Sequence, residues 1–379
     1  MSVPVPFLSF QRQNSVLRTE ILNAIASVHD SNNLILGDQV AAFEQEYAAF
    51  LGVPYCIGVA NGLEAMVLSL KALGIGNRIG PRKEEVIVPA NTYIATWLAV
   101  TQAGAIPVPV EPDMYNYNLH PARLEEKITQ YTRAILPVHL FGQPADMDPI
   151  NYLAGRYGLF VVEDNAHSHG AVYKGKVCGT MSAAGAHSFY PTKVLGALGD
   201  AGAITTTNET MAETLRAMRN YGSTRKNYHE NLGFNSRLDE VQAAVLRVKL
   251  RHLPVAQAER RNIAETYLSE LAGVGDLSLP RPQGENRHAW HLFVIRTASR
   301  DALAEFLRAE GIETMVHYPV PPHRQNAYKN LNFKDDSFPL TNLMARTMLT
   351  LPLFPGMRPD EIKSVTDAVK KFFTRSFIG

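Results

Sequence analysis

The chain contains an aspartate and a lysine whose types and surroundings are suited to holding a carbonyl cofactor. Asp164 stands at the end of an apolar run, and Lys193 follows it in Ser188-Phe-Tyr-Pro-Thr-Lys193. A lysine in a partly buried pocket can lose its proton and form an imine with an aldehyde. A carboxylate beyond a strand end can hold a protonated pyridine nitrogen through a charge-assisted hydrogen bond. The pair predicts pyridoxal 5'-phosphate (PLP), joined to Lys193 as a Schiff base, with Asp164 at the ring nitrogen.

The residues around Lys193 favour this interpretation over a surface lysine. Val194 and Leu195 follow it directly, unlike the neighbours of a solvated charge, and glycines allow backbone to approach a ligand. These glycines are Gly196, Gly199 and Gly202. Taken alone, a lysine is usually exposed and an aspartate in this position usually caps a helix or lies in a loop. The combination of both residues favours cofactor binding.

A phosphate group needs its own anchor, and residues 57–65 predict one. Asn61 and Glu64 have the spacing of a helix cap, so Gly62 and Leu63 would begin a helix with free backbone N–H groups. Ser188 could add a hydroxyl donor. A plain capped helix and an ordinary turn serine are the competing interpretations.

Aromatic and histidine residues extend the candidate site. Tyr93 follows another strand end and could stack on a flat cofactor, although core packing is by itself the more common role of such a residue. His167 and His169 form a His-x-His pair, but no third ligand stands at a suitable spacing, so we expect no metal. His167 could instead donate to the phenolic oxygen of the cofactor. The glycines after Lys193 lack the spacing of a dinucleotide-binding loop, which argues against NAD.

The elements that must position these residues follow an alternating order. Short apolar runs predict strands, and apolar residues recurring every three or four positions predict helices between them, which indicates an α/β domain with a mostly parallel sheet. The expected strands are Tyr55–Val59, Glu85–Val88, Ile106–Val110, Ala134–Val138, Leu159–Glu163 and Ala203–Thr207, and two of the expected helices span residues 17–28 and 40–50.

A capping pattern at Ser236 and Asp239 predicts a helix that ends before Pro254. We therefore expect a large PLP-binding domain of residues 1–253 and a smaller C-terminal α/β domain of residues 254–379. The smaller domain would contain a strand at Trp290–Ile295 and helices around Leu303–Ala309 and Ile362–Phe372.

Composition narrows the class of protein. The 379 residues carry a formal net charge of +1 and only two cysteines, and no basic stripe suggests nucleic acid or an anionic membrane as a partner. Residues 1–10 lack a charged region followed by a long apolar core, so we expect no signal peptide, and no apolar run is long enough to span a bilayer. We expect a cytoplasmic protein in a reducing compartment.

These motifs together resemble the sugar aminotransferases of the DegT/DnrJ/EryC1/StrS family. The resemblance runs from Pro6-Phe-Leu8 into the small domain, and its most specific segments are residues 162–171, 188–193, 233–237 and 317–323. Residues 60–65, 91–95 and 139–144 look closest to enzymes that aminate C3 of dTDP-3-oxo-6-deoxyhexoses. The resemblance implies the fold type I aminotransferase architecture, with a mostly parallel seven-stranded sheet in the large domain.

The resemblance also implies roles for individual residues. Lys193 would carry PLP, Asp164 would contact the pyridine nitrogen, and Tyr93 would lie against the ring. Gly62, Leu63 and Ser188 would bind the phosphate, and Asn235 would reach the phosphate in the neighbouring subunit of a homodimer. Tyr190, His317 and Tyr318 would face the sugar.

One departure concerns His167, where the family usually has glutamine. Imidazole can still donate to the phenolic oxygen, but we expect an altered pH response, because histidine titrates near neutrality. Lys193 is retained, which favours transamination over the dehydratase chemistry of relatives that have histidine there.

The implied reaction takes an amino group from L-glutamate, stores it as pyridoxamine phosphate and delivers it to a nucleotide-sugar ketone. The expected substrate is a dTDP-3-oxo-6-deoxyhexose of galacto or gluco configuration, used in surface polysaccharide (such as O-antigen) or antibiotic sugar synthesis. Amination at C4 of a dTDP- or UDP-4-oxo-6-deoxy sugar, and a PLP-binding regulator without turnover, remain open.

Overall fold

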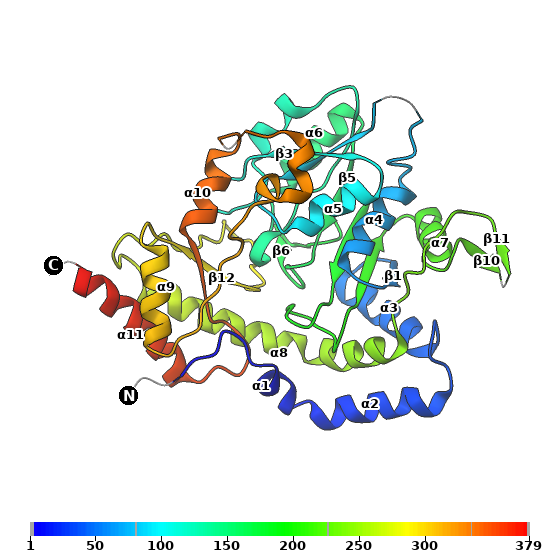
Figure 1. Ribbon diagram of the computed structural model, residues 1–379. Helices are drawn as coiled ribbons and strands as arrows, with labels where there is room; N and C mark the ends of the chain where they lie inside the picture. Colours follow the sequence, from blue (N-terminus) through cyan, green and yellow to red (C-terminus); the bar gives the residue numbers. More distant parts are fainter. Residues whose placement is uncertain (1–3, 80–81, 226, 335, 377–379) are drawn as a thin grey trace.

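A seven-stranded sheet forms the centre of the molecule (Figure 1). This computed structural model describes residues 4–79, 82–225, 227–334 and 336–376. The strand order is β1-β9-β8-β5-β4-β2-β3, and β9 alone of these seven runs antiparallel to its neighbours. The predicted mostly parallel sheet is confirmed. Its strands are β1 (Tyr55–Val59), β2 (Glu85–Pro89), β3 (Ile106–Val110), β4 (Thr132–Ile135), β5 (Phe160–Asp164), β8 (Ala184–Ser188) and β9 (Gly202–Thr206).

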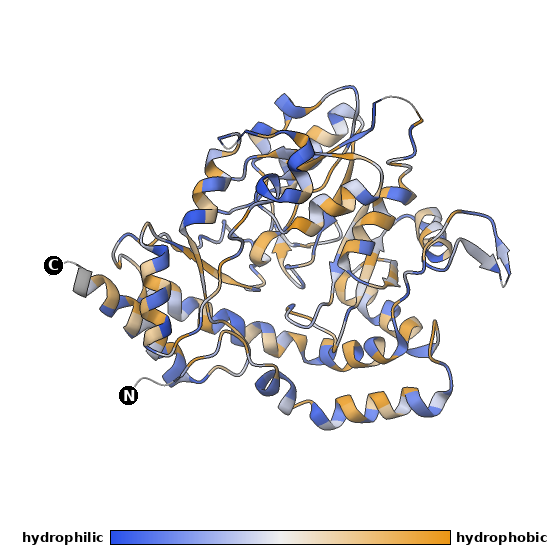
Figure 2. Ribbon diagram, in the orientation of Figure 1, coloured by the Kyte–Doolittle hydropathy of each residue, from blue (hydrophilic) through white to orange (hydrophobic). Residues whose placement is uncertain are grey.

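Helices cover both faces of this sheet, which explains why its strands are apolar on consecutive residues. One face packs against α4 (Gly62–Ala72), α5 (Ile94–Gln102) and α7 (Glu209–Met218). The other packs against α3 (Asp38–Leu51), α6 (Met147–Tyr157) and α8 (Glu240–Glu270). In Figure 2 the buried helix α5 is predominantly coloured as hydrophobic.

The long helix α8 connects the sheet to a second layer of structure near the chain ends (Figure 1). There, β12 (Phe293–Arg296) pairs with β13 (Met348–Leu351), and α9 (Arg300–Ala309), α10 (Pro339–Thr347) and α11 (Pro359–Ser376) lie around this pair. A separate apolar core unites α8 and α11 with both strands. The expected C-terminal helices are therefore confirmed.

The remaining elements are peripheral. Helix α1 (Phe10–Ser15) is short, and α2 (Arg18–Ser31) packs along α8. The hairpin of β10 (Ser223–Arg225) and β11 (Tyr228–His229) projects away from the body in Figure 1. The other elements of the described residues are the pair β6 (Val172–Tyr173) and β7 (Lys176–Val177) and the 3₁₀ helices Pro121–Arg123, Glu125–Lys127, Leu140–Gly142, Pro322–Arg324 and Asn326–Leu331.

Three local details differ from what the sequence predicts. Strand β8 was not expected, and β4 ends at Ile135 although the apolar run continues to Val138, because Val138 forms only an isolated bridge with Asp164. Ser236 does not cap α8: Asp239 precedes the helix, and Ser236 Oγ accepts a hydrogen bond from the Ala60 N–H at 3.3 Å.

Helix α8 also continues through Pro254 instead of ending before it. Pro254 lies on the exposed side of the helix, where the carbonyl that loses its partner can meet water. The predicted division between residues 253 and 254 therefore falls inside a continuous helix, and the two-domain assignment stays a prediction. Residues 1–3 and 377–379, at the ends of the two expected domains, lie outside the described residues.

Candidate active site

A cavity of about 510 Å³ lies beyond the carboxyl end of β5. Ligands of open parallel sheets bind at this edge. Ten of the predicted site residues line the cavity: Gly62, Leu63, Tyr93, Asp164, His167, Ser188, Tyr190, Lys193, His317 and Tyr318. Asn235 does not. It is exposed and forms an isolated backbone bridge with Asn220.

Asp164 is the last residue of β5 and points to the same face of the sheet as α5. Its carboxylate accepts hydrogen bonds from the Ala166 N–H at 3.1 Å and from the Thr96 hydroxyl at 3.0 Å. Burial raises the pKa of Asp164, while these two donors and the nearby Lys193 act in the opposite direction. A cationic ring nitrogen facing this carboxylate would stabilise its charged form.

Lys193 lies in the loop between β8 and β9 and is partly buried. Its backbone N–H donates to the Tyr190 carbonyl at 2.9 Å, which closes a tight turn over residues 190–193. Burial lowers the pKa of Lys193 to about 8, and Asp164 offsets part of this effect. Near neutral pH the amine therefore exists partly in its uncharged, nucleophilic form.

The amino end of α4 offers donors for an anion. The Asn61 side chain accepts from the Glu64 N–H at 2.9 Å, so the predicted cap is confirmed. Gly62 lies directly against Ser188, where an added Cβ would stand 2.5 Å from the Ser188 Cβ. This close contact brings the free N–H groups of the first helical turn beside the Ser188 hydroxyl, a donor set that fits a phosphate.

His167 is held in one neutral tautomer. Its Nδ1 accepts a hydrogen bond from the Phe141 N–H at 3.2 Å, so the ring proton must reside on Nε2. Burial lowers the pKa of His167 well below its usual value, and the charge of Lys193 lowers it further. The expectation that His167 titrates near neutrality is therefore wrong: a donor for a phenolic oxygen is retained, but without a charge change.

Tyr93, His317 and Tyr318 form the outer wall of the cavity. Tyr93 is half exposed, and its ring lies 5.2 Å from that of Tyr318. His317 Nδ1 pairs with Thr350 Oγ1 at 2.8 Å, and burial lowers the pKa of His317 to about 4. These side chains therefore present aromatic surfaces with polar tips, suited to a flat ring or a sugar.

A second cavity of about 580 Å³ adjoins the first. The two share the lining residues Tyr93, Tyr190, Thr192, His291 and His317. A cofactor beside Lys193 would therefore leave adjoining space for a substrate.

Sequence reasoning missed Thr96 and the polar network behind Asp164. Thr96, on α5, fixes one Asp164 oxygen and is itself paired with the Thr92 hydroxyl at 2.9 Å. Both threonines lie in Asn91-Thr-Tyr-Ile-Ala95-Thr96, beside the predicted Tyr93. The one available signal was a hydroxyl in the first turn of a helix that follows a strand, which is too common to be specific.

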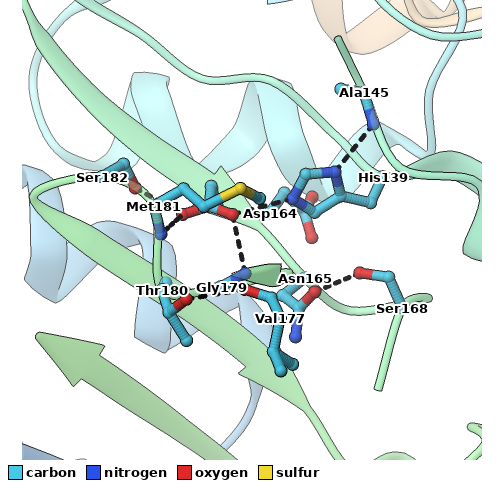
Figure 3. Close-up of polar contacts among 12 residues, drawn as sticks. His139, Ala145, Asp164, Asn165, Ser168, Val177, Gly179, Thr180, Met181 and Ser182 are labelled. Carbon is cyan, nitrogen blue, oxygen red and sulfur yellow. Dashed lines mark hydrogen bonds and ion pairs between the residues drawn. The ribbon is translucent and has the colours of Figure 1, made fainter. Parts of the chain in front are cut away.

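The missed network centres on Glu163. Successive side chains of a strand point to opposite faces, so Glu163 points away from the cavity that Asp164 faces. Its Oε1 accepts from the Met181 N–H at 2.7 Å and the Ser182 hydroxyl at 2.8 Å. Its Oε2 accepts from the Gly179 N–H at 2.7 Å and from His139 Nε2 at 3.0 Å. Figure 3 shows His139, Gly179, Met181 and Ser182 converging in this region. The sequence signal for this network was an acidic residue, Glu163, inside an otherwise apolar strand.

His139 connects this network to the segment that follows β4. Its Nδ1 accepts from the Ala145 N–H at 2.9 Å (Figure 3). This leaves Nε2 as the donor to Glu163. Its backbone N–H donates to the Asp164 carbonyl at 3.1 Å. Glu163 and His139 together therefore fix the backbone that carries Asp164.

The second histidine of the His-x-His pair is part of the core. Both ring nitrogens of His169 are buried without a hydrogen-bond partner among the described residues, and the ring stacks on Phe189 at 5.3 Å. Within the same described ranges, no group of three or more His, Cys, Asp or Glu side chains could hold a metal ion. Cys56 and Cys178 are both buried and free. No helix in the part of the chain that the structure covers is long and apolar enough to cross a membrane.

Comparison with known proteins gives this site a family context. Residues 15–370 match the DegT/DnrJ/EryC1/StrS aminotransferase family. The chain is 46% identical to the dTDP-3-amino-3,4,6-trideoxy-alpha-D-glucose transaminase of Streptomyces venezuelae, over 98% of this chain and 97% of the relative. It is also 46% identical to the dTDP-3-amino-3,6-dideoxy-alpha-D-galactopyranose transaminase of Aneurinibacillus thermoaerophilus, over 97% and 99%. A pleiotropic regulatory protein of Geobacillus stearothermophilus is 41% identical over 97% and 98%.

Solved structures agree. The crystal structure of S. venezuelae DesV in complex with a ketimine intermediate superposes with a TM-score of 0.95 at 46% identity, covering 98% of this chain and 99% of that one. The structure of NtdA from Bacillus subtilis, with bound cofactor PMP, has a TM-score of 0.89 at 31% identity, covering 98% and 85%. The expected aminotransferase fold is confirmed. The chain belongs to the DegT/DnrJ/EryC1/StrS aminotransferase family, whose members are PLP-dependent enzymes.

Proposed function

We propose that this chain is a PLP-dependent transaminase that moves an amino group from L-glutamate to C3 of a dTDP-3-oxo-6-deoxyhexose. The observation that carries the proposal is the pairing of partly buried Lys193 with buried Asp164 in one cavity. The names of two of the relatives that are 46% identical, both transaminases of dTDP-3-amino sugars, support C3 as the position.

The residues of the cavity have separate tasks in this proposal. PLP, when bound, would supply the electron sink and carry the amino group between the two substrates. Lys193 holds the cofactor and, once displaced, moves the proton from the donor Cα as general base. Asp164 holds the ring nitrogen protonated, and His167 donates its Nε2 proton to the phenolic oxygen.

Other residues of the cavity contact the phosphate and the sugar in this proposal. Gly62, Leu63 and Ser188 hold the phosphate at the amino end of α4, and Tyr93 stacks on the ring. Tyr190, His317 and Tyr318 orient the sugar from the wall shared with the second cavity. Asn235 completes the phosphate site of a partner subunit in a homodimer. Its exposure and its place beside the projecting hairpin support this role.

A direct test offers the purified protein L-glutamate and, separately, the galacto and gluco 3-oxo sugars and a 4-oxo-6-deoxy sugar. We expect product only with a 3-oxo sugar, with nitrogen on C3 in the NMR spectrum. Nitrogen on C4 would replace the proposal with the C4 transaminase.

A second candidate is a PLP-binding regulator without turnover, supported by the regulatory name of the G. stearothermophilus relative. The two candidates differ in the absorbance of the bound cofactor. Loss of the PLP band on addition of L-glutamate supports the transaminase, whereas an unchanged band supports the regulator.

A further inference from the structure

A buried arginine lines the second cavity, and the reaction proposed above does not yet assign it a role. Arg260, on α8, is only 2% exposed, yet it lines this cavity. Most other lining residues are apolar or aromatic, among them Leu351 and Leu353. A buried guanidinium in such a setting needs a compensating anion or several good acceptors.

The described residues satisfy Arg260 only in part. Its Nη1 donates to the carbonyls of Trp290 at 3.2 Å, Leu353 at 3.3 Å and His291 at 3.5 Å, distances at or beyond the upper end of the usual N–H···O range. Its buried Nε has no acceptor among the described residues. The guanidinium carries five N–H donors, and these hydrogen bonds all come from one nitrogen.

No carboxylate among the described residues neutralises this charge by direct contact. Glu259 lies nearby, but its Oε2 accepts from the Gly356 N–H at 2.8 Å. Glu313 lines the same cavity, and its Oε2 accepts from the Phe7 N–H at 2.9 Å. Burial lowers the pKa of Arg260 to about 10, so the group remains a cation at neutral pH.

The cavity that Arg260 lines adjoins the Lys193 cavity. His291, whose carbonyl is one of the Arg260 acceptors, lines both cavities, and its ring lies 4.5 Å from that of His167. A reactant bound at Lys193 can therefore extend past His291 toward the guanidinium.

We propose that Arg260 binds a carboxylate of the amino donor. The inference rests on the transaminase function proposed above, in which the amino acid is the one reactant with carboxylates. A planar guanidinium matches a carboxylate through two parallel hydrogen bonds. The diphosphate of the nucleotide sugar is the alternative anion, and the binding of the amino sugar to the same variants separates the two.

The experiment separates the two half-reactions of the holoenzyme. Arg260→Gln and Arg260→Lys are compared with Arg261→Gln, which removes the neighbouring, partly buried arginine of the same helix. Bound cofactor is first measured by absorbance to show that each variant folds. Rapid-mixing absorbance then gives the apparent Kd of L-glutamate with the PLP form, and of the dTDP-3-amino sugar with the same form.

We expect Arg260→Gln to raise the apparent Kd of L-glutamate by about 100-fold, the scale for removing one partner of a buried charge pair. The Kd of the amino sugar should stay within about threefold of the wild-type value, as should both values in Arg261→Gln. Arg260→Lys keeps the positive charge but cannot form two parallel hydrogen bonds. Its apparent Kd for L-glutamate should therefore lie between those of the wild type and Arg260→Gln. If Arg260→Gln does not fold, the Kd values of Arg260→Lys are compared with those of the wild type and Arg261→Gln instead.

An unchanged glutamate Kd, or an equal loss for the amino sugar, would overturn the assignment. The second outcome would mean that Arg260 acts on the diphosphate or on the fold. If wild-type protein itself does not respond to L-glutamate, the proposed function fails before Arg260 is tested. The two failures are thus distinguishable.

Discussion

At the scale of single residues, the reactivity of Lys193 is set by burial. Removing the ammonium from water lowers its pKa from 10.5 to about 8, and Asp164 limits the decrease. Only the neutral amine attacks an aldehyde, so the reactive fraction of Lys193 increases as pH rises through about 8.

This gives a pH prediction for cofactor loading. The rate constant for PLP binding to the apoprotein should rise with pH and level off above about pH 8. Stopped-flow absorbance from about pH 6 to about pH 10 measures it, with Nα-acetyl-lysine as the control amine. A rate that climbs in parallel with that of the free amine would contradict the lowered pKa.

The residues found from sequence were those with both a distinctive type and a distinctive position. Asp164 and Lys193 could be predicted because a charge next to an apolar strand or between small residues is unusual. Thr96 and Arg260 could not, because each owes its role to contacts between segments far apart in the chain. The tautomer of His167 likewise depends on the Phe141 N–H, which no local pattern reveals.

At the scale of elements, the end of β5 is fixed by the buried carboxylate of Glu163, on the face of the sheet opposite to Asp164. Glu163 is fully buried and accepts four hydrogen bonds, three of them from the segment 179–182. Asp164, the next residue, faces the opposite side of the sheet. The position of Asp164 therefore depends on a network whose residues do not line the cavity.

Replacing Glu163 by glutamine should reduce the free energy of unfolding by about 3 kcal/mol. The amide group of glutamine would meet N–H or O–H donors where the carboxylate accepts them. Urea denaturation measures the change, and Glu213→Gln, at an exposed position on α7, should change stability by less than about 0.5 kcal/mol. Equal stability of the two variants would show that the network contributes little.

The elements predicted correctly were those with a strong apolar period. Helices α2 and α3 and strands β1 and β3 match their apolar repeats. Strand β8 was missed because Ala184-Gly-Ala-His-Ser188 has no β-branched or large apolar residue, and its place between β5 and β9 decides its conformation. The continuation of α8 past Pro254 was missed because burial of the later turns outweighs the local cost of proline.

At the scale of the whole molecule, one exposed residue points beyond the single chain. Asn235 stands apart from the cavity that the other ten predicted site residues line. We propose that it acts in the site of a partner subunit, across the interface of a homodimer. We also propose that residues 1–253 and 254–379 form the two domains, joined within α8.

Mixing two inactive variants tests this assembly. Lys193→Ala lacks the cofactor amine, and Asn235→Ala lacks the proposed phosphate contact. A mixed dimer would contain one site with Lys193 from one subunit and Asn235 from the other, both intact. We expect activity to return when the two proteins are unfolded and refolded together, as followed by amino-sugar formation.

The controls are each variant refolded alone and the two refolded separately before mixing. No recovery in the co-refolded sample, with a dimer still seen by sedimentation, would mean that Asn235 acts within its own subunit. A monomer by sedimentation would remove the shared site altogether.

The central claim is a covalent bond between PLP and the Lys193 amine, and borohydride reduction followed by peptide mass spectrometry tests it most directly. After reduction of the purified holoprotein, we expect a pyridoxyl phosphate label on the peptide containing Lys193 and none in Lys193→Ala. A label on another lysine, or an unlabelled Lys193 peptide from protein that retains its PLP absorbance, would contradict the account.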